Sequence, residues 1–68
     1  MSDDRVTVYS FGRGQDDAVW ALIYALVERG LRARLRMRWH GDQITLPASQ
    51  LPALRKLQTD EPERFGGC

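Results

Sequence analysis

Four arginines at every second position are the residues of this chain whose type and spacing could do chemistry. They lie in the segment 31–40, LRARLRMRWH, where apolar and basic residues alternate without exception. A guanidinium group stays charged at neutral pH and binds phosphate or carboxylate through two parallel hydrogen bonds. We therefore predict a site for a polyanion, formed by these arginines and two residues of a neighbouring strand. Its predicted members are Arg32, Arg34, Arg36, Arg38, Arg5 and Tyr9.

Two kinds of polyanion fit this pattern, and a third interpretation needs no ligand. Alternate residues of a β-strand present their side chains at intervals of about 6.6 Å, close to the repeat of a nucleic-acid backbone. Tyr9 could stack on a base, and binding without a known base-reading arrangement would not depend on sequence. An acidic protein surface is the second candidate. In the third interpretation, the arginines cover the apolar layer with their stems and pair with carboxylates of the C-terminal segment.

The alternating segment is typical of a half-buried strand, and the preceding sequence predicts what packs beside it. Its apolar side chains are expected to face inward: Leu31, Ala33, Leu35, Met37 and Trp39. The β-branched and aromatic segment 5–11 predicts a first strand. Val6 and Val8 are expected to face inward, which leaves Tyr9 on the outer side with the arginines.

A helix is predicted between these two strands, and a strand and a short helix after them. The first helix begins at Gln15 or Asp16 and ends at Gly30, a residue common after helix C-termini. Its predicted core stripe has helical spacing and comprises Val19, Leu22, Ile23, Leu26 and Val27. A tight turn over 40–43 precedes a third strand over 44–46. The leucines at 51, 54 and 57 predict a second helix that starts at Ser49 or Gln50.

The predicted fold is an α+β, two-layer β-α-β-β-α sandwich with a three-stranded mixed sheet. A right-handed crossover makes the first two strands parallel, and a hairpin adds the third. Both helices are expected on one face of the sheet, because a helix on the other face would bury four arginines without partners. Arginines and short polar residues therefore share an open face.

One small domain is predicted for the whole chain, because 68 residues bury only about 60% of their unfolded surface and cannot support two cores. The ordered core is expected to span about 5–58. The remaining segment, about 59–68, contains Pro62 and several acids, and it predicts a flexible tail in which Phe65 is the candidate for docking. No role is assigned to its last three residues, Gly66, Gly67 and Cys68.

The sequence predicts no enzyme, no cofactor and no metal site. Cys68 is the only cysteine and His40 the only histidine, so the ligands of a structural zinc site are not present. The Gly12–Gly14 loop lacks a full phosphate-binding fingerprint, and Asp16 and Asp17 follow it where a phosphate would lie. We interpret the loop as a plain turn. No small-molecule substrate is evident.

No membrane segment is predicted, and a cytoplasmic location is expected. The longest apolar run, over 18–27, has ten residues, against about 20 needed to cross a bilayer. The N-terminus opens on MSDDR rather than on the basic and apolar regions of a signal peptide. A single cysteine is typical of a reducing compartment.

The first functional hypothesis is a non-enzymatic binding module that holds nucleic acid or an acidic protein surface through the arginine strand. The alternative is a protein-interaction module, a homodimer or a small inhibitor, with analogy to viral and mobile-element proteins. It would use Trp20 and Tyr24, which widen the apolar arc of the first helix to about 200°. Aromatic side chains are enriched at interface hot spots.

Overall fold

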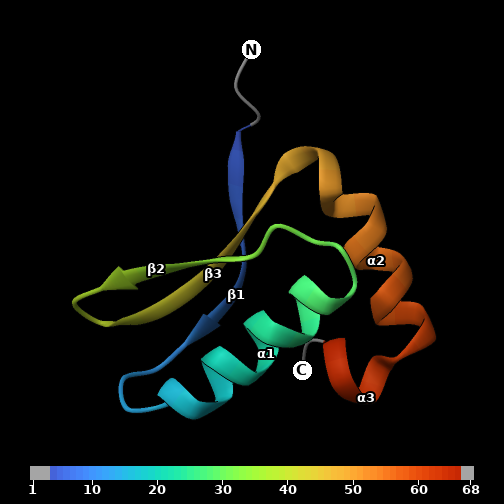
Figure 1. Ribbon diagram of the computed structural model, residues 1–68. Coiled ribbons are helices and arrows are strands. Elements are labelled where there is room, and N and C mark those ends of the chain that lie inside the picture. Colours follow the sequence, from blue (N-terminus) through green and yellow to red (C-terminus); the bar gives the residue numbers. More distant parts are fainter. Residues whose placement is uncertain (1–3, 67–68) are drawn as a thin grey trace.

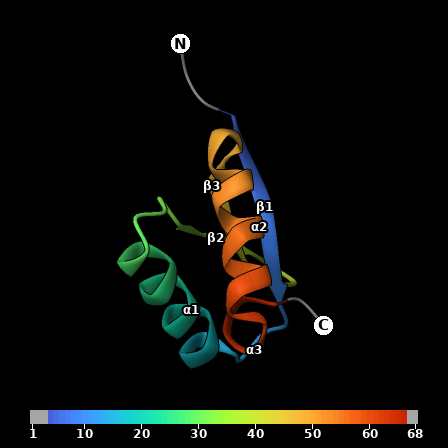
Figure 2. The ribbon, with the colours of Figure 1, turned by 90° about the vertical axis from the view of Figure 1, so that its right-hand side faces the viewer.

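Three strands form one sheet with all helices on the same face in the computed structural model, which describes residues 4–66 (Figure 1). The elements are β1 (Arg5–Phe11), α1 (Asp16–Glu28), β2 (Arg34–Arg38), β3 (Gly41–Pro47), the 3-10 turn η1 (Ala48–Gln50), α2 (Leu51–Asp60) and α3 (Pro62–Phe65). The view in Figure 2 shows α1 on one side and α2 with α3 on the other side of the helical layer. The predicted two-layer α+β fold is confirmed.

The sheet has the strand order β1-β3-β2, with β3 antiparallel to both neighbours. β1 and β2 run parallel to each other, as predicted, but β3 lies between them, so the sheet is antiparallel rather than mixed. The side chains explain this order. Ile44 and Leu46 of β3 are fully buried, which suits a central strand, whereas the arginines of β2 suit an edge strand, where charged side chains also hinder pairing with other chains.

A β-bulge in β1 reverses the predicted orientation of Tyr9. Thr7 pairs with Thr45, but Tyr9 pairs with Ile44, so Val8 is an extra residue in the ladder. A bulge shifts the alternation of side chains by one position. Tyr9 therefore lies on the helix face with Ile44, packed against the core, and the prediction that it faces outward with the arginines is wrong.

The core lies between the sheet and the helices, and partly buried side chains of β1 and β2 pack against it. Its buried residues are Val19, Ile23, Ala25, Leu26, Leu31, Ile44, Leu46, Leu54 and Phe65. The stripe predicted for α1 is largely correct, but Val27 is half exposed and Ala25 is buried in addition. α1 ends where predicted, since Gly30 adopts a left-handed backbone with φ 86° and the amide of Leu31 donates to the carbonyl of Leu26.

The C-terminal segment is folded, in contrast to the flexible tail predicted from about residue 59. α2 continues to Asp60 and α3 follows, while residues 67 and 68 lie outside the described residues. The side chain of Phe65 is 0% exposed, and its carbonyl accepts a hydrogen bond from the hydroxyl of Tyr9. Arg29 pairs with Glu61 at 2.8 Å and lies over the Phe65 ring. The acids and the proline suggested disorder, but these long-range contacts fix the segment.

The β2–β3 hairpin extends beyond the helical layer, away from α2 and α3 (Figure 1). Its turn is Trp39–His40, directly before Gly41, and not the predicted 40–43 segment. The expectation that Met37 and Trp39 face the core is wrong, because no helix reaches under this end of the sheet. Met37 is 77% exposed and Trp39 is 84% exposed.

Candidate nucleic-acid interface

Three arginines of β2 form a row on the open face of the sheet. This arginine row consists of Arg34, Arg36 and Arg38, all of them exposed. Their cross-strand partners on β3 are Thr45, Gln43 and Gly41, and Thr45 and Gln43 pair in turn with Thr7 and Ser10 of β1. Directly paired residues share a face of the sheet. The open face therefore has a charged edge on β2 and small or neutral polar side chains beside it.

Arg5 lies on the same face but holds the sheet together. Its Nε donates to Thr45 Oγ1 at 3.1 Å, and its terminal nitrogen donates to the carbonyls of Thr45 and Arg32 at 2.8 and 2.6 Å. The amide of Arg32 in turn donates to Gln50 Oε1 at 2.7 Å. These bonds fix the backbone just before β2 and leave the side chain of Arg32 exposed. The structure thus brings together four of the predicted site arginines, with Arg5 as a positioning residue.

The charges of the arginine row are not neutralised by the fold. Within residues 4–66, the salt bridges join Arg29 to Glu28 and Glu61, and none involves an arginine of β2. The hydrogen bond that Arg29 donates to Glu61 raises the pKa of Arg29 above its ordinary value. Asp42, the carboxylate of the hairpin, pairs with Met37 and so lies on the opposite face. The row therefore presents uncompensated positive charge to solvent.

Trp39 is exposed at the end of β2 and does not lie in the core, where it was predicted. It follows Arg38 directly and lies in the hairpin turn. Its ring contacts His40 edge-to-face, with centroids 5.2 Å apart. The position of Trp39 beside the turn residues His40 and Gly41 could have indicated that it is exposed. The end of a hairpin need not be covered by a helix.

The second predicted interface, on α1, is also exposed. Trp20 is 43% exposed and Tyr24 is 63% exposed, and their rings lie 5.8 Å apart at 35°. Val27 continues this apolar strip along the helix. The strip is on a different side of α1 from Ala18 and Ala25, and Ala21 lies between the two sides, as the helical period requires. The two rings contact each other, and each keeps part of its surface exposed to solvent.

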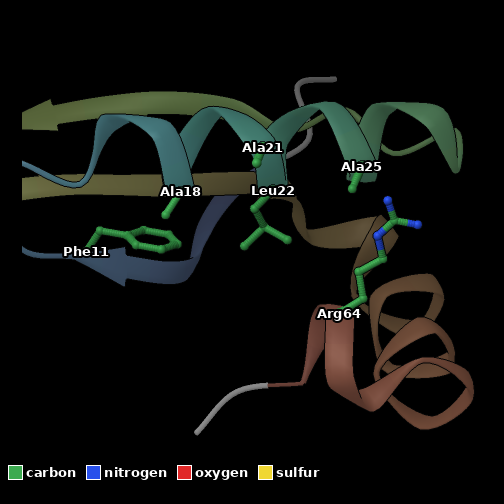
Figure 3. Close-up of a pocket in the computed structure, with 6 residues that line it drawn as sticks. All are labelled: Phe11, Ala18, Ala21, Leu22, Ala25 and Arg64. Atoms are coloured by element: carbon green, nitrogen blue, oxygen red, sulfur yellow. The ribbon is translucent and has the colours of Figure 1, made fainter.

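An open groove between α1 and α3 has a volume of about 320 Å³. Figure 3 shows its lining, in which Leu22 and Phe11 point into the space below α1 and Arg64 reaches toward Ala25. Small apolar side chains and one cation line the groove. It offers no nucleophile and no carboxylate, so it has no set of groups for acid–base or covalent catalysis.

No residues within 4–66 form a group of three or more His, Cys, Asp or Glu side chains that could hold a metal ion. The Arg13–Gly14 segment is a turn, as predicted, and Asp16 and Asp17 lie in the first turn of α1, where carboxylates favour the helix dipole. Among the described helices, none is long and apolar enough to cross a membrane. Comparisons with protein-family models, curated proteins and solved structures find no match for this chain.

Proposed function

We propose that this protein is a non-enzymatic module that binds the backbone of nucleic acid through the arginine row and Arg32. The observation that carries this proposal is the row itself: three exposed guanidinium groups on alternate residues of one strand, none paired with a carboxylate in the described chain. Alternate positions are about 6.6 Å apart, which lets successive phosphates meet successive arginines. We also propose that it works in the cytoplasm, where its single cysteine would stay reduced.

Two features favour nucleic acid over an acidic protein surface as the partner. The row is regular, like a backbone with one charge per nucleotide, whereas the carboxylates of a folded protein surface have no fixed repeat. Trp39 follows Arg38 in the chain and is exposed, and proteins that bind single-stranded nucleic acid combine cations for the phosphates with aromatic rings for the bases. Because the row carries no fixed pattern for base edges, binding should be independent of sequence.

The test is a titration of labelled oligonucleotides by fluorescence anisotropy at several salt concentrations. Three or four phosphate contacts on a single strand predict a slope of about −2 to −3 for log K against log salt. Raising the salt fourfold should therefore weaken binding about 20- to 50-fold. An affinity that does not change with salt concentration, or no binding at low salt, would contradict the proposal.

A matched pair of charge reversals locates the site. Arg34→Glu with Arg36→Glu should abolish binding and leave the fold intact, because both side chains are exposed and neither forms a salt bridge with a described residue. Arg55→Glu with Lys56→Glu changes the net charge equally on α2, away from the hairpin (Figure 1). This control should bind nearly as well as the unchanged protein. Equal losses in both variants would mean that overall charge, and not the row, holds the ligand.

A second candidate function is supported by the exposed strip on α1. Trp20 and Tyr24 are the residue types that dominate protein interfaces, and a homodimer or a complex with another protein would cover them. The strip contributes few residues against the roughly 20–30 per side of a stable interface, so we rank it second. Light scattering tests it: a dimer that Trp20→Ala dissociates would support it, and a monomer at all concentrations would remove the homodimer.

A further inference from the structure

The tip of the β2–β3 hairpin combines the most exposed tryptophan of the chain with the last arginine of the row. Trp39 is 84% exposed, and a large apolar ring left in water is unfavourable for a small protein with a limited core. His40 contacts the indole edge-to-face, so at least one face of the ring stays open. A flat, open, aromatic face beside a cation matches a nucleobase next to its phosphate.

We propose that Trp39 stacks on an unpaired base, which makes single-stranded nucleic acid the preferred ligand of the arginine row. This inference rests on the proposed function and adds the class of ligand to it. The geometry supports it because Arg38 ends β2 and Trp39 begins the turn, so two exposed side chains lie at the same end of the hairpin. A strand whose phosphates follow Arg34, Arg36 and Arg38 passes over the hairpin tip, where its next base meets the indole.

Duplex nucleic acid cannot use this contact, because its bases are stacked on each other and their faces are closed to a side chain. Its phosphates can still meet the arginines. The two ligands therefore share the ionic part of the binding and differ in the stacking part. The preference for single strands should disappear when the ring is removed and should persist when another ring replaces it.

Three variants at position 39 separate stacking from other roles. Trp39→Ala should weaken the binding of a single-stranded oligonucleotide about 5- to 150-fold, the range for loss of one stacked base, and leave duplex binding within about twofold. Trp39→Phe should recover part of the affinity, whereas Trp39→Leu, which is apolar but not aromatic, should not. The salt slope for single strands should stay unchanged, because the number of phosphate contacts is the same.

Fluorescence gives a direct second readout. The chain has two tryptophans, so in a Trp20→Phe background the emission comes from Trp39 alone. Stacking on a base should quench it when single strands bind, and a duplex should quench it much less. The turn position and the exposure of Trp39 predict unchanged circular dichroism for all variants.

The outcomes separate this inference from the function on which it rests. If the unchanged protein binds both ligands with salt dependence but Trp39→Ala binds both as tightly, the row binds nucleic acid and the stacking inference is wrong. An equal loss for single strands and duplex would also overturn it, because a general role of the hairpin would explain that result. If the unchanged protein binds neither ligand, both proposals fail.

Discussion

Replacing Phe65 by alanine should destabilise the protein strongly, although Phe65 is the last but one of the described residues. The Phe65 side chain is 0% exposed, and the guanidinium of Arg29 lies over its ring. Removing a buried phenylalanine costs about 3–5 kcal/mol. A domain of this size has a total stability of about 3–10 kcal/mol, so the variant should keep at most a marginal fold.

Urea denaturation followed by circular dichroism measures this effect. With a slope of about 1 kcal/mol per molar urea for a small protein, the midpoint should fall by about 3 M or the variant should be unfolded without urea. Phe65→Leu keeps most of the volume and should cost less than about 1.5 kcal/mol. Glu63→Ala, at an exposed position of α3, should change stability by less than about 0.5 kcal/mol. A loss below about 1 kcal/mol for Phe65→Ala would mean that the segment after α2 does not pack.

Two further substitutions test how β1 meets its neighbours. Gly41→Ala should lower the free energy of unfolding by more than about 1 kcal/mol in urea denaturation. Gly41 has φ +150°, and an added Cβ would collide with the carbonyl oxygen of Phe11. Gly12→Ala is the neutral control, because no atom lies within 4 Å of an added Cβ there. Tyr9→Phe removes the hydrogen bond to Phe65 and should cost about 1 kcal/mol without changing oligonucleotide affinity. A loss of affinity at normal stability would mean that Tyr9 contacts the ligand.

The sequence predicted the elements of this fold well because periodicity depends on local spacing. The bounds of β1, the end of α1 at Gly30 and the leucines of α2 all follow from short-range patterns. The strand order could not be derived in the same way. The hairpin strand could pair at the outer edge of β2 or between β1 and β2. It lies between them, where the 44–47 segment of β3 is buried.

The placement of the candidate site residues in the fold was predicted in part, and the errors have specific physical causes. The exposed row of arginines follows from alternation and was predicted. Tyr9 was placed on the wrong face because the extra residue at Val8 breaks the alternation, and a bulge leaves no signal in a short β-branched segment. Phe65 was assigned to a flexible tail because its partners, Tyr9 and Arg29, are more than 30 residues away.

The hairpin end is the part of the sheet that the fold needs least. Beyond Leu35, β2 contributes no residue to the buried core. The residues that follow are all exposed: Arg36, Met37, Arg38 and Trp39. A 68-residue domain has a small margin of stability, so residues that bind a ligand are best placed where they do not also support the core. Variants of this end should therefore change binding without changing the unfolding midpoint, and variants around Phe65 should change the midpoint first. The separation of these two effects would distinguish a surface specialised for a ligand from one that only keeps the sheet edge solvated.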